Sequence, residues 1–96
     1  MPLTLSQLLA QIKRNDPQAD TTLVELAYEY AAEAHQGQTR RSGEPYIQHS
    51  LRTALTLAEI RAETDVVIAG LLHDVPEDTS RSLAELEKQF GKKIAS

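Results

Sequence analysis

The feature that most constrains the fold is the stretch from Val66 to Leu72, in which nearly every side chain is apolar. A helix that is apolar on almost all sides must be surrounded by other elements, so this segment is predicted to be the most buried helix. Pro76 cannot continue that helix, because it lacks an amide donor and its ring clashes with the preceding turn. The helix is therefore expected to end close to His73 and Asp74.

The segments before this helix also show the apolar period of helices. The first helix is predicted to begin after Thr4, with Thr4 and Gln7 as a capping box, and to stop at Asn15-Asp16-Pro17. A second helix is expected to start near Thr22 and to end around Gln36-Gly37. Its predicted buried face consists of Leu23, Leu26, Ala27, Tyr30, Ala31 and Ala34.

A polar loop over residues 38–49 is predicted to precede a third helix, with Ser50 as its N-cap. Ser82 is the expected N-cap of a helix that closes at Gly91, and residues 92–96 resemble the opening of a further element. No segment shows the alternation that is typical of strands. The predicted fold class is therefore all-α, with about five helices and the start of a sixth.

Composition excludes several classes of function. A chain of 96 residues can form one domain with a single core, but not a second lobe. The absence of cysteine excludes disulfides, thiolate metal sites and thiol catalysis. A net charge of −4 argues against DNA binding through a general positive field, so an anionic ligand requires a local basic patch. No apolar run approaches the roughly 20 residues that span a membrane, and a cytoplasmic protein is expected.

His73 and Asp74 are at the centre of the densest group of reactive side chains. Adjacent residues on a helix point about 100° apart, so the two can share one ion only where the helix is ending. Imidazole and carboxylate ligands suit Mn, Fe, Zn and similar divalent ions. His49 is the obvious third ligand, because a loop-to-helix junction can hold its side chain firmly. A bound ion would activate a water molecule for attack.

Further charged residues flank this predicted metal site. Glu77 and Asp78 could move a proton to or from the reacting group. Arg40 and Arg41 would supply a charged surface that recognises phosphate oxygens.

Each of these residues also has an ordinary structural interpretation. His73 and Asp74 could form a helix-end hydrogen bond, and the Glu77-Asp78 pair could be favourable charges in a first helical turn. Arginines in a loop are usually solvated, and His49 alone could be a helix cap. His35 is interpreted as structural rather than ligating. Tyr28, Tyr30 and Tyr46 are likewise interpreted as structural, as aromatic side chains that pack in the core or against a loop.

Four segments taken together, and in order, carry a more specific signal than any single residue. They are Ala34-His35-Gln36-Gly37-Gln38, Arg40 through His49, Leu71-Leu72-His73-Asp74, and Glu77-Asp78-Thr79. These segments closely resemble the hydrolase domain of the RelA/SpoT family, whose members turn over the alarmone ppGpp and belong to the HD-domain metal phosphohydrolases. The resemblance runs from about Leu26 to Ile94, and it implies an HD-domain helical fold.

The resemblance also implies a role for each candidate residue. The implied ligands of manganese, or of another divalent metal, are His49, His73 and Asp74. The residues that match the loop gripping the guanosine end of the substrate are Arg40, Arg41 and Ser42. Glu77 and Asp78 match the acidic pair associated with hydrolysis. The implied reaction is attack of a metal-activated water on the 3′-pyrophosphate of ppGpp or pppGpp, which releases pyrophosphate and GDP or GTP.

Two departures from the family pattern shape the expectation for this chain. Ser50 stands where the family usually has proline, and both residues suit a helix start. The family also completes its metal shell with an aspartate on a later helix, for which residues 1–96 offer no match. The chain is therefore expected to be a single partial HD domain, with weak or no hydrolysis by itself.

Two alternatives to this hydrolase remain open. One is a non-catalytic helical module that keeps the domain's helices and self-associates, or docks on another polypeptide, through exposed apolar faces. The other is an HD phosphohydrolase acting on a different nucleotide, against which the Arg40-Arg41-Ser42 loop argues within the resemblance.

Overall fold

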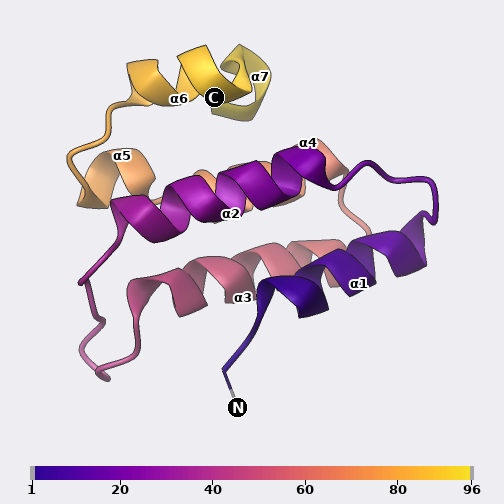
Figure 1. Ribbon diagram of the computed structural model, residues 1–96, viewed down its shortest axis with the longest axis horizontal. Helices are drawn as coiled ribbons and strands as arrows, with labels where there is room; N and C mark the ends of the chain where they lie inside the picture. Colours follow the sequence, from indigo (N-terminus) through magenta and orange to yellow (C-terminus); the bar gives the residue numbers. More distant parts are fainter. Residues whose placement is uncertain (1, 96) are drawn as a thin grey trace.

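The computed structural model describes residues 2–95, and this part of the chain is all-α, as predicted. The helices are α1 (Leu5–Asn15), α2 (Thr22–Ala34), α3 (Tyr46–Glu59), α4 (Thr64–Leu72), α5 (Val75–Asp78), α6 (Leu83–Phe90) and α7 (Lys92–Ala95). Figure 1 shows α6 and α7 on one edge of the molecule and α1 and α3 towards the opposite edge. No helix among the described residues is long and apolar enough to cross a membrane.

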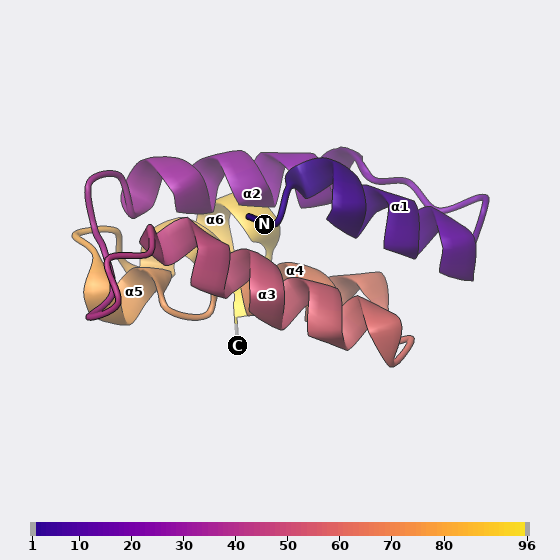
Figure 2. The same ribbon diagram turned by 90° about the horizontal axis from the view of Figure 1, so that it is seen from below.

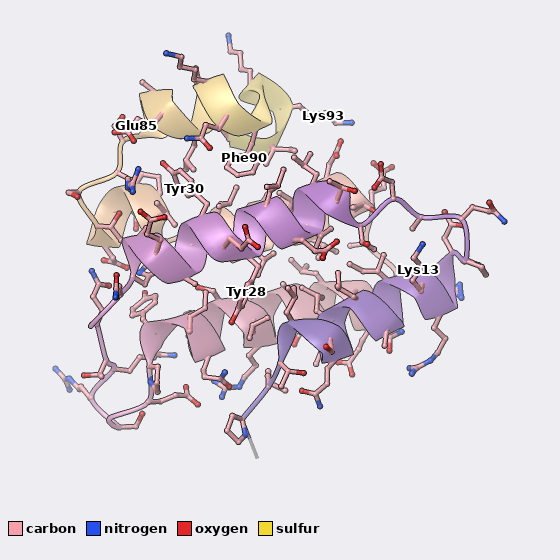
Figure 3. All side chains as sticks on the ribbon, in the orientation of Figure 1. Lys13, Tyr28, Tyr30, Glu85, Phe90 and Lys93 are labelled. Carbon is pink, nitrogen blue, oxygen red and sulfur yellow. The ribbon has the colours of Figure 1, made fainter. Side chains whose placement is uncertain are left out.

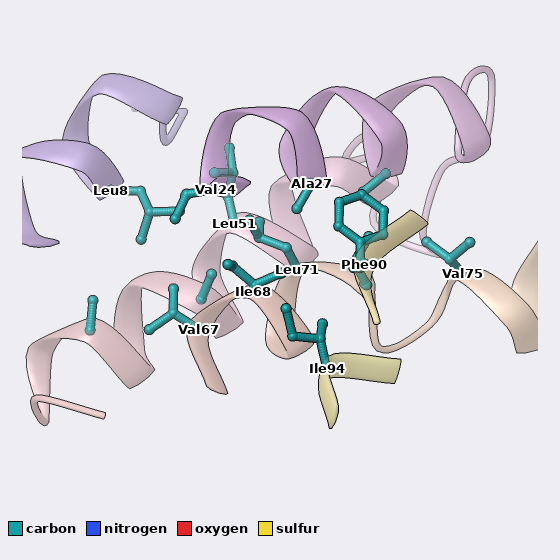
Figure 4. Close-up of a cluster of buried hydrophobic side chains, with 14 of the residues drawn as sticks. Leu8, Val24, Ala27, Leu51, Val67, Ile68, Leu71, Val75, Phe90 and Ile94 are labelled. Carbon is teal, nitrogen blue, oxygen red and sulfur yellow. The ribbon is translucent and has the colours of Figure 1, made fainter. Parts of the chain in front are cut away.

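The central helix is α4, which packs against α3, α2 and α7. Its buried side chains are Val67, Ile68, Leu71 and Leu72. Figure 4 shows Val67, Ile68 and Leu71 among apolar side chains of the surrounding helices. The prediction of burial on all sides is wrong for Val66, which is 45% exposed, because the neighbouring helices leave one face of α4 uncovered.

The amino-terminal helix α1 lies along α3, as seen in Figure 2, and is tied to it at both ends. The predicted capping box is confirmed, because Thr4 and Gln7 exchange hydrogen bonds between side chain and backbone. The Gln48 amide pairs with both the N–H and the C=O of Leu3, at 2.7 and 2.8 Å. At the other end, Asn15 donates to the carbonyl of Ala58 at 2.7 Å. The contact at Gln48 holds the start of α3, and the contact at Ala58 holds its end.

The buried face of α2 is rotated about the helix axis relative to the predicted face. Val24, Ala27 and Ala31 are buried, whereas Leu26 is 51% exposed and does not belong to the core. Val24, Ala27 and Ala31 are spaced to form one stripe, from which Leu26 points about 100° away. The helix also ends before the predicted Gln36-Gly37, since His35 is already its C-cap residue.

The prediction that Ser50 caps α3 is wrong. The helix begins four residues earlier, at Tyr46, after the extended residue Pro45 (φ −55°, ψ 138°). Ser50 lies inside the helix with 3% of its surface exposed, on the face shared with Leu51 and Ala54. Burial of this face therefore decides where the helix runs, and the serine hydroxyl does not act as a cap.

The segment after α4 contains a short helix, α5, which is not among the helices predicted from the sequence, although a first helical turn at Glu77 and Asp78 was left open. Pro76 occupies its first turn, where the missing N–H has no intrahelical partner to lose. The predicted cap of α6 is confirmed, because Ser82 accepts a hydrogen bond from the Glu85 N–H, and Gly91 ends the helix with φ 90°. Figure 3 shows Tyr30 of α2 facing Phe90, and their rings meet edge to face at 5.5 Å.

Truncation of Leu71 to alanine is expected to lower the free energy of unfolding by about 2–5 kcal/mol, because the fully buried side chain (0% exposed) leaves a cavity. Chemical denaturation followed by circular dichroism measures the change. Leu26→Ala is the matched control, and the 51% exposed side chain should cost less than about 1 kcal/mol. Equal losses in the two variants would contradict the position of the core.

Candidate functional site

The junction between α4 and α5 brings the His73 and Asp74 side chains together. His73 is the C-cap of α4 and Asp74 the N-cap of α5, and both have right-handed helical backbone angles. Because two helix ends meet here, the neighbouring side chains can turn towards each other. His73 Nδ1 lies 2.9 Å from Asp74 Oδ1, although the His73 side chain is 74% exposed.

The Asp74 carboxylate also receives two residues from the start of α3. The Tyr46 hydroxyl donates to Oδ2 at 3.0 Å, and His49 Nε2 lies 3.5 Å from the same oxygen. Burial alone would raise the pKa of this carboxyl, but the hydrogen bonds from His73 and Tyr46 outweigh it, so the pKa lies below its usual value. Asp74 is therefore a charged centre on which two imidazoles converge.

The neighbouring acidic residue Asp78 is held by two different groups. Tyr46 approaches its Oδ2 at 2.8 Å, and the Gln38 amide donates to its backbone carbonyl at 2.6 Å. Burial, and then the contacts with Asp78 and Asp74, raise the pKa of Tyr46, so its hydroxyl keeps its hydrogen. Tyr46 thus lies between the carboxylates of Asp74 and Asp78, and the two carboxylates share its single hydroxyl hydrogen.

A tight turn carries the predicted substrate-binding loop past this site. The Gly43 N–H donates to the Arg40 carbonyl at 2.8 Å, and the Arg40 N–H donates to the Glu44 carbonyl at 2.9 Å. Gly43 has φ 87°, a backbone conformation in which glycine avoids the Cβ clash of other residues. Arg52 of α3 pairs with the Glu44 carboxylate at 2.8 Å and anchors the turn to the helix.

Arg40 contacts one of the two imidazoles directly, with Nη1 located 2.7 Å from His49 Nδ1. A guanidinium can only donate, so Nδ1 accepts and the ring hydrogen sits on Nε2, facing Asp74. Ligation of a metal by Nε2 needs the opposite tautomer. Arg40 would therefore have to turn away before His49 could bind an ion through Nε2.

The donors around Asp74 fit a divalent ion by their chemistry, since two imidazoles and a carboxylate suit first-row metals. In the conformation seen, these donors are paired with one another. No group of three or more His, Cys, Asp or Glu within residues 2–95 is arranged to hold a metal ion. The metal site inferred from the sequence therefore stays a prediction.

Not every predicted site residue joins this cluster. Glu77 and Arg41 are exposed, and neither side chain makes a hydrogen bond or ion pair with another described residue. The Ser42 hydroxyl accepts from the Glu44 N–H at 3.3 Å, within its own turn. The side chains of Glu77 and Arg41 are therefore not held in place by contacts within residues 2–95.

A groove opens beside the cluster, between α3 and α4. It encloses about 420 Å³ and is lined by His49, Thr53, Leu57, Ala69, Gly70, His73 and Asp74. A second hollow of about 360 Å³ lies at the other end of α3, next to Asn15 and Arg61, and has no imidazole in its lining. The reactive side chains and the first groove therefore define the candidate site.

Residues 27–96 match the family model for the HD domain. The chain belongs to the HD domain family. A solved structure of a metazoan ortholog of SpoT that hydrolyses ppGpp shares this fold, with a TM-score of 0.74 and 30% identity. That likeness covers 81% of this HD domain's chain and 46% of the metazoan protein.

Named relatives of this HD domain act on guanosine polyphosphates. The bifunctional (p)ppGpp synthase/hydrolase SpoT of Escherichia coli is 44% identical over 79 residues, which are 82% of this chain and 11% of SpoT. A guanosine-3′,5′-bis(diphosphate) 3′-pyrophosphohydrolase of Aquifex aeolicus is 46% identical over 72 residues, covering 75% of this chain and 10% of the enzyme. The chain thus spans about a tenth of the length of these curated relatives, and the predicted resemblance is confirmed.

The sequence analysis did not assign His35, Gln38 and Tyr46 to the candidate site of this HD domain, although all three contact its residues or one another. Tyr46 was interpreted as a packing aromatic, yet its hydroxyl bridges two carboxylates. His35 is indeed structural, with 2% of its surface exposed, and its ring stacks on Tyr46 at 4.5 Å. The available signal was their presence in the segments that carry the family resemblance.

The ion pair between Glu44 and Arg52 of this HD domain can be tested by titrating the Glu44 carboxyl. Arg52 is the main cause that holds the pKa of Glu44 below its usual value, so Arg52→Gln should raise that pKa towards the value of a free glutamate. The pair's stabilising contribution is present above the unfolded-state pKa and is lost as pH falls through the folded-state pKa. Carbon-detected NMR titration measures the Glu44 carboxyl.

Arg81→Gln is the control for this titration, because Arg81 pairs with Glu33 and Glu85 rather than with the turn. The Glu44 titration should be unchanged in that variant. A Glu44 pKa that does not respond to Arg52→Gln would contradict the anchoring of the turn.

Proposed function

We propose that this HD domain is the hydrolase part of a metal-dependent phosphohydrolase that removes the 3′-pyrophosphate of ppGpp or pppGpp. The observation that carries the proposal is the convergence of His49 and His73 on Asp74, with Asp78 joined to the same centre by Tyr46. The named activities of relatives that are 44% and 46% identical support the choice of substrate.

In this proposal His49, His73 and Asp74 hold the metal ion, with manganese as the proposed metal. A bound divalent ion supplies a nucleophilic water at neutral pH by lowering the pKa of that water. The low pKa of Asp74 keeps its carboxylate in the charged form that ligation requires. The remaining polar contacts of Asp74 restrict the directions that its oxygens can face.

Asp78 and Glu77 act on protons in the proposed reaction, but from different environments. Asp78 is fixed by Tyr46 and can hold the attacking water in line or accept its proton. Glu77 is exposed on the same short helix and can move to the leaving pyrophosphate. Asp78 thus suits the side of the attacking water in an in-line displacement, and Glu77 suits the side of the leaving pyrophosphate.

The turn with Arg40, Arg41 and Ser42 binds the guanosine end of the substrate in this proposal. Arg41 has no hydrogen-bond or ion-pair partner among residues 2–95 to give up, so it is available to a ligand anion. Arg40 would exchange the His49 ring for the substrate. That exchange also releases His49 Nδ1 to carry the hydrogen that ligation through Nε2 needs.

Titration calorimetry with Mn²⁺ tests the proposed ligands. Asp74→Asn should weaken Mn²⁺ binding at least about tenfold, because it removes the only carboxylate among the three candidate ligands. Release of pyrophosphate from ppGpp by the 96-residue chain is expected to be slow, to depend on Mn²⁺ and to be lost in Asp78→Asn.

Asp65→Asn is the control, since this carboxylate pairs with Lys93 at 3.2 Å on the surface. Mn²⁺ affinity and pyrophosphate release should both survive that change. Hydrolysis without a divalent ion, or Mn²⁺ affinity that is equal in the Asp74 and Asp65 variants, would contradict the proposal.

Self-association is a second candidate function, and the exposed apolar side chains favour it. These large side chains are Leu26, Ile60, Val66 and Leu83. Ile60 is the C-cap residue of α3 and is 71% exposed. The same helix lines the groove with Thr53 and Leu57. Water contact at such positions is unfavourable, so a second copy or another polypeptide could cover them.

Light scattering at several concentrations tests self-association. The apparent mass should rise with concentration, and Ile60→Lys should reduce the rise by replacing an exposed apolar side chain with a charged one. Arg61→Lys, which keeps the charge next to this position, is the control. A constant mass at all concentrations would count against the interaction surface.

A further inference from the structure

A chain of contacts connects the buried ring of His35 to the acidic residue Asp78. The His35 ring stacks on Tyr46 with ring centres 4.5 Å apart and planes 17° apart, and its Nδ1 lies 3.0 Å from Gln38 Oε1. Gln38 then donates to the Asp78 carbonyl, and Tyr46 donates towards the Asp78 carboxylate. Asp78 is thus contacted at both its backbone and its side chain.

The orientation of each group in this chain follows from its chemistry. A backbone carbonyl can only accept, so the amide nitrogen of Gln38 must face Asp78 and the amide oxygen must face His35. That oxygen can only accept in turn, so His35 Nδ1 carries a hydrogen. The contacts are directional and specify one arrangement of His35, Gln38 and Asp78.

The anchor of this arrangement is the burial of His35. Its residue surface is 2% exposed, at the C-cap of α2, and its Nε2 is buried without a hydrogen-bond partner among the described residues. A buried polar atom that lacks a partner is costly and needs a compensating role. In this position the His35 ring stacks on Tyr46 and contacts Gln38, and these two interactions are the compensating role.

The need for outside support arises from the length of α5. This helix comprises Val75–Asp78 and has backbone hydrogen bonds from the N–H groups of Asp78 and Thr79. A single turn is unstable without tertiary contacts, because forming the first turn fixes several residues for few hydrogen bonds. Gln38 and Tyr46 supply such contacts at the Asp78 end of the turn.

We propose that His35, Gln38 and Tyr46 are positioning residues that hold the Asp78 carboxylate at a fixed separation from Asp74. The inference rests on the proposed function for its catalytic meaning, because only there does Asp78 act on the attacking water. Tyr46 contacts both carboxylates, whereas Gln38 contacts only the backbone of Asp78. Substitution of Tyr46 is therefore expected to affect both Asp74 and α5, whereas substitution of Gln38 should affect α5 alone.

Tyr46→Phe and Gln38→Met separate these effects, and both keep the approximate size of the side chain. Amide hydrogen exchange at Asp78 and Thr79 should be about tenfold faster in both variants, while exchange in α1 stays unchanged. Mn²⁺ affinity measured by calorimetry should fall about tenfold in Tyr46→Phe only, because only Tyr46 orients the Asp74 carboxylate.

Each variant has a matched control in the chain. Tyr30→Phe removes a hydroxyl that contacts a carboxylate outside the site, Glu85 at 3.5 Å. Gln36→Met changes an exposed glutamine two residues from Gln38. Neither control should alter amide exchange in α5 or the Mn²⁺ affinity.

Exchange in α5 that matches the controls would overturn the proposal. Faster exchange in all helices, together with a lower melting temperature, would also overturn it, because it would indicate a general structural role. If the unchanged chain binds no Mn²⁺, the proposed function fails, and amide exchange alone then decides whether His35, Gln38 and Tyr46 position α5.

Discussion

Burial of α4 among α3, α2 and α7 is the constraint on which the candidate site depends. Leu71 and Leu72 on one side of the polar pair, and Val75 on the other, are at most 3% exposed. His73 and Asp74 therefore lie between two anchored segments, and their backbone cannot shift without moving core residues. A polar junction placed in this way can present ligands to solvent from a rigid base.

The sequence predicted the helices well where the signal was local. The capping box of Thr4 and Gln7, the cap at Ser82 and the end of α4 before Pro76 each depend on residues that are close in the chain. Ser50 shows the limit of this reasoning. A serine before an apolar stripe suits an N-cap, but the contact of Leu3 with Gln48 and the buried face of α3 favour a helix that begins at Tyr46.

The site was predicted in part for the same reason. Ligand chemistry and the family resemblance predicted that His49, His73 and Asp74 lie together, and the structure places both imidazoles next to the carboxylate. The bridging role of Tyr46 could not be identified. Its partners lie 28 and 32 residues further along the chain, so no local pattern distinguishes its hydroxyl from that of a packing tyrosine.

The site consists of a part that the core fixes and a part that solvent surrounds. His35, Tyr46 and Asp74 are held by stacking and hydrogen bonds, whereas His73, Arg41 and Glu77 are exposed. Exposed side chains lose rotamer entropy when a ligand fixes them, and this loss opposes binding. Under the proposed function, the fixed part should therefore determine the geometry of the reacting groups, while the ordering of the exposed side chains should oppose the binding of metal and substrate. An effect on rate without an effect on Mn²⁺ affinity is accordingly expected from the Gln38 contact, which reaches Asp78 alone, whereas changes in the arginine turn are expected to alter substrate affinity.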